Sequence, residues 1–234
     1  MGCLIFDGVR AFDYAVIGEV WANRASRPGL PAFDLRVCGP DGARVRLGGG
    51  LERVPDHGTA ALADCDLVVV PGVEDPGAAR DPAVLAALRA VRARGVPIAS
   101  LCAGAFVLAE AGLLDGREAT THWAVAPELA RRFPAVTVRP EVLFTGGDGL
   151  WTSAGVAAGI DLCLHLVRTA HGQRPPPPSP APWSPRPSGP AARPSSSPPR
   201  CRPPPPTIPF PGSAPRSSPP WTPPGASPGW PRPP

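Results

Sequence analysis

The sequence of 234 residues contains no lysine, one methionine and one tyrosine, so all 23 of its basic residues are arginine. Residues 173–234 also lack leucine, valine, aspartate and glutamate, and they hold 27 of the 38 prolines. A segment of this composition cannot bury enough apolar surface to offset the entropy lost on ordering. We therefore predict one folded domain over residues 1–172 and a disordered tail rich in proline, arginine and serine over residues 173–234.

The formal net charge of +4 arises in this tail, which carries seven arginines and no acidic residue. Residues 1–172 hold 16 arginines and 19 acidic residues. This balance gives no electrostatic reason to expect the domain to bind nucleic acid. The sequence also lacks an apolar run long enough to span a membrane, and its first residues do not form a signal peptide. We therefore expect a cytoplasmic protein that makes no membrane contact.

The six cysteines form no CxxC pair and no spacing typical of metal ligands, so we predict neither a metal site nor a cofactor. Several of them lie in apolar runs, as buried reduced thiols do, and this fits a reducing compartment. They are Cys3, Cys38, Cys65, Cys102, Cys163 and Cys201.

Short apolar runs alternate with helical patterns along the first 172 residues. The predicted strands cover 3–6, 33–39, 66–72, 96–101 and, around a Gly-Asp-Gly turn, 136–154; the predicted helices cover 11–25, 81–95, 103–112, 123–133 and 154–172. Helix 81–95 has the clearest signals, with Asp81 as its cap, Pro82 at its first position and Gly95 as its stop. This alternation predicts a flavodoxin-like three-layer α/β sandwich, a mostly parallel sheet with helices on both faces.

Cys102 directly follows the predicted strand 96–101 and precedes a helix. In open sheets of this class, the reactive crevice lies beyond the carboxyl ends of the strands. The order strand, cysteine, small residue, glycine, helix is typical of a nucleophile elbow, and Ala103 and Gly104 supply the small neighbours that its tight turn needs. Amides of the first helical turn would lower the pKa of the thiol. The alternative is a structural cysteine that is buried only for packing.

The stretch "LCAGAFVLAEAGLLDGREATTHW" resembles the core of the ThiJ/PfpI superfamily, which is related to class I glutamine amidotransferases. Further matching stretches are "IFDGVRAFDYAVIGEVW", "VVVPGVED" and "WTSAGVAAGIDLCLHLV", so the resemblance covers residues 3–172. Within the superfamily, the chain is most similar to the amino-terminal domain of AraC-type transcriptional regulators.

The resemblance implies a set of site residues. Cys102 matches the elbow cysteine, Glu19 matches the acid that hydrogen-bonds to the sulfur, and His122 matches a histidine close to it. Gly72 and Val73 match the loop whose amides lie beside the sulfur, where they would stabilise an oxyanion. From the residues alone, Glu19 could equally be a solvated helix residue, His122 a histidine bonded to backbone, and Gly72 a simple turn.

Three more residues are expected at the ligand-binding crevice: Ala103, Thr152 and Ser153. Ala103 also separates the chain from two branches of the superfamily. The protease-like branch has its histidine base at this position, and the isonitrile hydratase branch often has a threonine there. The leading interpretation is therefore the ligand-sensing and dimerisation domain of an AraC-type regulator. The alternatives are a Cys102-dependent hydrolase or hydratase, isonitrile hydratase-like or glyoxalase-like, and a redox sensor in which Cys102 is oxidised.

Regulators of this type continue into a helix-turn-helix domain of roughly a hundred residues. The tail, residues 173–234, has no helical periodicity, and its proline density forbids helices. Either it is a genuine segment that docks into aromatic-lined grooves, or it is the product of a shifted reading frame in a GC-rich gene. DNA is an expected partner only if a helix-turn-helix domain is restored.

Overall fold

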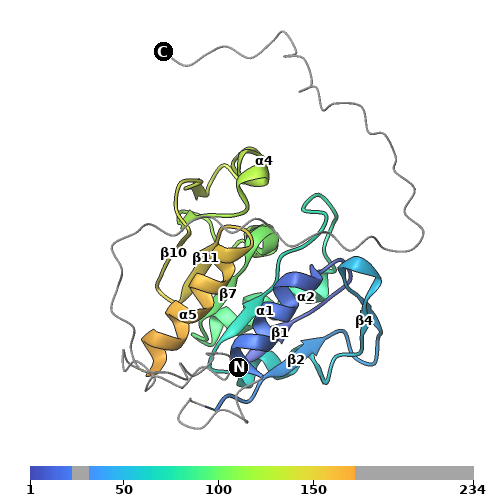
Figure 1. Cartoon of the computed structure of the whole chain (residues 1–234). Helices are drawn as coiled ribbons and strands as arrows, with labels where there is room; N and C mark the ends of the chain where they lie inside the picture. The colour runs from blue at the N-terminus through green and yellow to red at the C-terminus, as the bar shows by residue number, and fades with distance from the viewer. Residues whose placement is uncertain (23–31, 172–234) are drawn as a thin grey trace, which may run out of the picture. The chain divides into compact units, whose positions relative to one another are not determined.

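The computed structural model describes residues 1–22 and 32–171 (Figure 1). The predicted tail, residues 173–234, and the end of the predicted helix 11–25 lie outside the described residues. The domain boundary at residue 172 therefore stays a prediction.

A seven-stranded sheet forms the centre of the domain, in the order β10-β11-β7-β6-β1-β2-β5. Every pairing is parallel except that of β10 with β11. Its strands are β1 (Gly2–Leu4), β2 (Arg36–Gly39), β5 (His57–Gly58), β6 (Val68–Val70), β7 (Ile98–Ser100), β10 (Phe144–Gly147) and β11 (Leu150–Ser153). This is the mostly parallel flavodoxin-like sheet that the alternating pattern predicts.

Helices cover both faces of this sheet. The crossover from β1 to β2 and the crossover from β6 to β7 run in opposite directions along the sheet. Because such crossovers are right-handed, α1 (Ala11–Trp21) and α2 (Pro82–Ala93) lie on opposite faces. Helix α5 (Ala157–His171) packs beside α1, and α3 (Ala105–Glu110) packs beside α2 (Figure 1). The predicted three-layer sandwich is confirmed.

Local signals account for two of the elements. The Asp81 side chain accepts the Ala83 N–H at 2.8 Å and caps α2, which begins at Pro82. Gly95 follows the helix with a φ of 77°, a value that favours glycine. In the turn between β10 and β11, Asp148 and Gly149 have φ values of 49° and 75°, as a type I′ hairpin requires.

Short elements between these were not predicted. They are β3 (Val45–Arg46), the 3₁₀ turn η1 (Gly48–Gly50), β4 (Glu52–Arg53), η2 (Thr59–Asp64) and β8 (Glu118–Ala119), which pairs with β9 (Thr137–Val138). The predicted helices 103–112 and 123–133 each begin as a 3₁₀ turn, η3 (Cys102–Gly104) before α3 and η4 (Trp123–Val125) before α4 (Ala126–Arg132). None of the helices in the described ranges combines the length and hydropathy needed to cross a bilayer.

The carboxyl ends of β1, β6 and β7 bring three loops together. The Arg10 N–H donates to the Gly72 carbonyl at 2.8 Å, and Val9 forms an antiparallel bridge with Val73. Cys102 follows β7 at the same edge. The fold thus places the predicted cysteine and the predicted glycine loop side by side.

Candidate functional site

Cys102 occupies a strained turn between β7 and η3. Its φ is 52°, in the left-handed region that costs about 1–2 kcal/mol for a residue with a side chain. The Thr121 hydroxyl holds the turn by donating to the Cys102 carbonyl at 2.9 Å. Gly104 makes room for it, since a Cβ there would lie 2.7 Å from the Pro71 carbonyl oxygen. This is the sharp turn that the cysteine-small residue-glycine pattern predicts.

The acid beside Cys102 is Asp13 of α1. Asp13 is 2% exposed, and its Oδ2 accepts the Gly72 N–H at 3.0 Å. Gly72 in turn packs against the cysteine, because a Cβ built on Gly72 would lie 3.0 Å from the Cys102 Cβ. Gly72 therefore contacts both the carboxyl of Asp13 and the side chain of Cys102.

Glu19, which the resemblance assigns to this role, lies on an exposed face of the same helix. Asp13 and Glu19 are six residues apart, and this separation places them about 120° apart around the helix axis. The buried face of α1 holds Asp13 together with Val16, Ile17 and Val20. We therefore replace Glu19 by Asp13 as the acid that faces the sulfur.

Burial raises the pKa of the Cys102 thiol, and the neighbouring Asp13 carboxylate raises it further. Backbone hydrogen bonds from Ala103 and Val156, together with the positive charge of Arg10, act in the opposite direction without outweighing burial. The elbow pattern alone predicts a lowered pKa. The direction reverses because the cysteine, which is 4% exposed, lies deeper than the pattern indicates.

Burial also raises the pKa of Asp13, against the opposing effects of the Arg10 charge, the Gly72 hydrogen bond and the His122 charge. Two acids that share one buried site do not both ionise easily. Ionisation of Asp13 therefore disfavours ionisation of the Cys102 thiol. A protonated carboxyl can donate a hydrogen bond, as we expected of the acid beside the sulfur.

Only some of the backbone amides that we predicted to contact the Cys102 sulfur do so. Ala103 supplies one backbone hydrogen bond to Cys102, as expected, and Val156 supplies the other. The Gly72 N–H is instead taken by Asp13, and Val73 is buried in its bridge with Val9. Gly72 thus positions the acid rather than contacting the sulfur through its amide.

Val156 is itself in an unusual conformation. Its φ is 55°, although β-branched residues strongly disfavour this region, and its side chain is 53% exposed. It immediately precedes α5. Two strained residues, Cys102 and Val156, therefore meet at the sulfur.

His122 lies half-buried beside the site. Its Nδ1 accepts the Ala124 N–H at 3.2 Å, so in the neutral ring the proton is on Nε2. The edge of the ring that carries Cδ2 packs against Gly155, where any Cβ would overlap it. Its charge contributes to the pKa of Asp13, which places it near the pair. One nitrogen of the ring is thus already engaged with backbone.

Thr152 and Ser153 are fully buried within the end of β11. The Thr152 hydroxyl accepts the Thr120 N–H at 2.8 Å. The Ser153 hydroxyl has no hydrogen-bond partner among the described residues. Thr152 therefore has a structural partner, and neither side chain is presented to solvent.

Two cavities lie away from the cysteine. One, of about 280 Å³, lies between β8 and the β10–β11 hairpin, and Arg117, Asp148 and Thr152 are among its lining residues. The other, of about 420 Å³, borders Trp21 and Phe33 near the amino end of β1. Cys102 lines neither of them.

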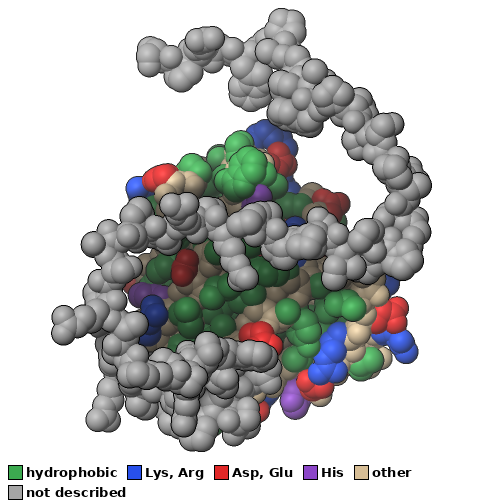
Figure 2. All heavy atoms as spheres, viewed as in Figure 1, with side chains coloured by type: hydrophobic (Ala, Val, Ile, Leu, Met, Phe, Trp, Pro, Cys, Tyr) green, Lys and Arg blue, Asp and Glu red, His purple; other side chains and the backbone are tan. Residues whose placement is uncertain are grey.

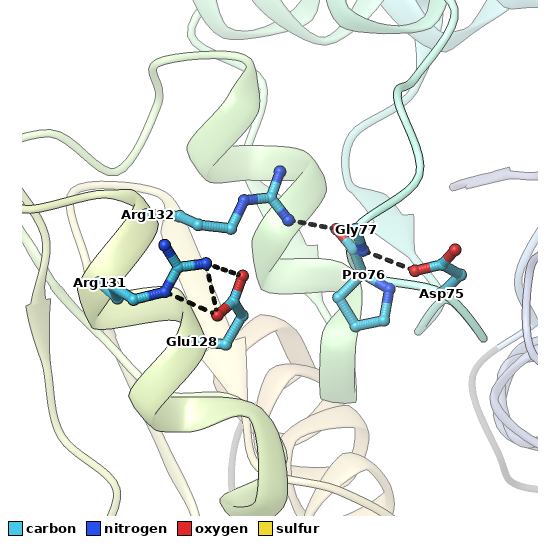
Figure 3. A network of polar contacts seen from close by, with 6 residues as sticks. All are labelled: Asp75, Pro76, Gly77, Glu128, Arg131 and Arg132. Carbon is cyan, nitrogen blue, oxygen red and sulfur yellow. Dashed lines mark hydrogen bonds and ion pairs between the residues drawn. The ribbon is translucent and has the colours of Figure 1, made fainter.

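The loop of residues 71–81, which joins β6 to α2 and is called the Gly72 loop below, is held from α4 (Figure 3). The Arg132 guanidinium donates to the Pro76 carbonyl at 2.6 Å and stacks on the rings of Phe106 and Phe133. Its neighbour Arg131 instead pairs with Glu128 within the helix. Arg132 thus ties the loop that carries Gly72 to the helix that follows His122.

Asp13 and Arg10 are the site residues that sequence reasoning missed. A signal for Asp13 was available, because it is the one charged residue on the stripe that it shares with Val16, Ile17 and Val20 at helical spacing. A carboxylate on an apolar helix face is seldom left there without a role. No comparable sequence signal identifies Arg10 or Val156.

The model of the DJ-1/PfpI family matches residues 3–169, and the chain belongs to this family. The regulator CdhR of Pseudomonas aeruginosa, an HTH-type transcriptional regulator, is 38% identical over 163 residues, which are 68% of this chain and 48% of CdhR. An isonitrile hydratase of Pseudomonas putida is 32% identical over 176 residues, 74% of this chain and 72% of the relative. The chain thus spans about half the length of the regulator.

Solved structures agree with this assignment. An AraC family transcriptional regulator from Pseudomonas putida superposes with a TM-score of 0.61 at 26% identity, over 74% of this chain and 92% of that one. A ThiJ/PfpI family protein from Pseudomonas syringae gives the same TM-score and identity over 77% of each chain. The resemblance to AraC-type and ThiJ/PfpI domains drawn from the sequence is confirmed.

Proposed function

We propose that residues 1–172 form the ligand-sensing domain of an AraC-type transcriptional regulator. The observation that carries the proposal is the buried pair formed by Asp13 and Cys102. Burial and the neighbouring Asp13 carboxylate both raise the pKa of the Cys102 thiol, and a neutral thiol is a poor nucleophile. Nδ1 of His122 accepts the Ala124 N–H, so this nitrogen is not free to act as a base toward the sulfur. Such a site is better suited to binding a ligand than to turning it over.

The relatives support the regulatory part of the proposal. CdhR and GbdR of Pseudomonas aeruginosa are HTH-type transcriptional regulators, and this chain covers 48% and 47% of their lengths. In a complete regulator, the sensing domain would act on a DNA-binding half, and DNA is a partner only where that half is present.

We also propose that the domain forms a homodimer. Three large apolar side chains are exposed on or beside α1 and α5: Phe12, Val156 and Ile160 are 45%, 53% and 37% exposed. In the view of Figure 2, hydrophobic side chains occupy much of the visible face over these helices. A second copy of the chain would cover such a surface. Light scattering coupled to gel filtration tests this, and a monomeric mass at micromolar concentration would contradict it.

The second candidate is an enzyme that uses Cys102 on an isonitrile or an α-oxoaldehyde. The identity to isonitrile hydratase favours it, and a protonated Asp13 could act as a general acid. Ala103 stands where that branch often has threonine, which counts against it.

One experiment separates sensing from turnover. The folded chain is incubated with isonitriles, small amides and α-oxoaldehydes, and product formation is followed alongside thermal shifts with a collection of metabolites. Sensing predicts a rise in Tm with a metabolite, and no substrate consumption above that of Cys102→Ala. Consumption that is lost in Cys102→Ala would instead establish the enzyme.

A further inference from the structure

Three side chains converge at the position that a Cβ of Gly72 would occupy. A Cβ built on this glycine would overlap Oδ2 of Asp13, and it would lie 3.0 Å from the Cys102 Cβ and 3.3 Å from the Arg10 Cδ. These side chains come from α1, the elbow and the loop after β1. The stem of Arg10 therefore crosses the same point at which the carboxyl and the thiol meet.

The Arg10 guanidinium is a cation without a partner in the described part of the chain. Its backbone is fixed, because its N–H donates to Gly72 at 2.8 Å and its carbonyl accepts the Tyr14 N–H at 3.1 Å. Its side chain is exposed and makes no hydrogen bond or ion pair with any described residue, unlike Arg36 and Arg139, which pair with acids. A carboxylate or a phosphate matches the geometry of such a guanidinium.

The Arg10 charge nevertheless acts on the site. It lowers the pKa of Asp13 more than the Gly72 hydrogen bond does, and it also lowers the pKa of Cys102. The guanidinium is thus close to both groups, yet it forms no ion pair with Asp13 within 4.0 Å. Because the Arg10 side chain is exposed, an anion can reach its guanidinium from solvent while Asp13 keeps its hydrogen bond to Gly72.

His122 and the exposed ring of Trp123 lie near the pair formed by Asp13 and Cys102. With Nδ1 accepting from Ala124, the neutral His122 ring has its proton on Nε2 and is a donor there. Trp123, which stacks on His122 with ring centroids 5.6 Å apart, is 75% exposed. The site therefore offers a cation and a second donor next to apolar surface.

We infer that the ligand of this site is a small molecule bearing a single carboxylate, which Arg10 binds beside Cys102. The inference rests on the proposed sensing function and names the chemical class of its ligand. Arg10 is the one cation among the three side chains that converge at Gly72, and no described residue pairs with its guanidinium, so a single carboxylate can pair with it. A planar carboxylate also matches the two parallel N–H groups of the guanidinium, and the apolar surface suits a short hydrocarbon body.

Two alkylating reagents of nearly equal size test the charge preference directly. Iodoacetate carries a carboxylate, whereas iodoacetamide is neutral. In each case, the sulfur attacks the methylene carbon, a C–S bond forms, iodide leaves with the electrons of the C–I bond, and the thiol proton passes to solvent. Tryptic cleavage after Arg94 and Arg117 gives a peptide in which Cys102 is the only cysteine, so mass spectrometry reports this site alone.

The measured quantity is the ratio of the iodoacetate rate to the iodoacetamide rate at Cys102, divided by the same ratio for N-acetylcysteine. We expect a normalised ratio of about 10 or more in the wild type, with saturation as iodoacetate increases, because charge-assisted hydrogen bonds hold the reagent. Arg10→Met should return the ratio to about 1. Arg36→Met, which removes an arginine at the amino end of β2, should leave the ratio at the wild-type value.

Two results would overturn the inference, and they differ in what they say of the proposed function. If Cys102 is alkylated with equal ratios in the wild type and in Arg10→Met, the carboxylate preference is false, whereas a reachable site remains. If neither reagent labels Cys102 in the folded chain but both label it in urea, no small molecule reaches the sulfur. The sensing function at this cysteine then fails as well. Circular dichroism of each variant verifies that it is folded.

Discussion

Replacing Gly72 by alanine tests how tightly the site is packed. The new methyl group would overlap Oδ2 of Asp13 and would press against the Cys102 Cβ and the Arg10 Cδ at 3.0 and 3.3 Å. Glycine is not needed here for its backbone conformation, because Gly72 is absent from the positions of positive φ. The whole effect therefore arises from the side chain that is added.

The magnitude follows from two contributions. Overpacking a buried site costs about 1–3 kcal/mol, and displacing Asp13 weakens its 3.0 Å hydrogen bond to Gly72, worth about 1–2 kcal/mol. We expect Gly72→Ala to lower the free energy of unfolding by roughly 2–5 kcal/mol. At about 2–4 °C for each kcal/mol in a domain of this size, Tm should fall by roughly 4–20 °C.

Gly18→Ala is the matched control. Gly18 lies within α1, and no described atom lies within 4 Å of a Cβ built there. Alanine should therefore stabilise the helix by about 0.5–1 kcal/mol. Urea unfolding followed by circular dichroism measures both variants. A Gly72→Ala variant that unfolds within 0.5 kcal/mol of the wild type would refute the close convergence on Gly72.

Three further predictions concern the residues around this point. Because the pKa of Asp13 is raised in the folded state, the contribution of this group to stability is complete below the usual pKa of 3.8 and is lost as pH rises toward the folded-state pKa. Asp13→Asn should therefore gain stability relative to the wild type between pH 4 and pH 7. A difference between the two proteins in urea unfolding that stays constant with pH would contradict this. Arg132→Met should lose about 1.5–3 kcal/mol with its bond to Pro76, whereas Arg131→Met, at an exposed ion pair, should lose at most about 0.5 kcal/mol; equal losses would show that Arg132 does not hold the loop. Val156→Gly relieves the strain of a left-handed φ of 55° and should stabilise the protein by about 0.5–1 kcal/mol. A Tm below that of the wild type would argue against strain at this position.

The fold could be predicted from the sequence wherever local chemistry and pattern agree. Asp81, Pro82 and Gly95 bound α2 because capping, a fixed φ and a positive φ each act within a few residues. The apolar run of β6 and the turn at Asp148 could likewise be predicted from residues close together in the sequence. Strands of two residues, such as β3 and β8, have too few positions for alternation to be visible, so tertiary pairing alone defines them.

The candidate site was predictable only in part. The sequence places Cys102 at a strand end with small neighbours, and this fixes the turn. The choice of acid depends on which face of α1 meets the elbow, and resemblance pointed to Glu19 where the apolar stripe indicates Asp13. The depth of Cys102, which reverses the direction of its pKa shift, depends on packing from several elements. The positive φ of Val156 runs against the preference of its residue type, so no local rule anticipates it.

The pH dependence of Cys102 alkylation by iodoacetamide in two variants, Asp13→Asn and Glu19→Gln, tests the central claim most directly. The carboxylate of Asp13 raises the pKa of the thiol, so Asp13→Asn should move the midpoint of the rate profile to lower pH. Glu19→Gln, on the exposed face of the helix, should leave the midpoint where it is in the wild type. A profile that moves with Glu19→Gln and stays fixed with Asp13→Asn would contradict the pairing of Asp13 with Cys102.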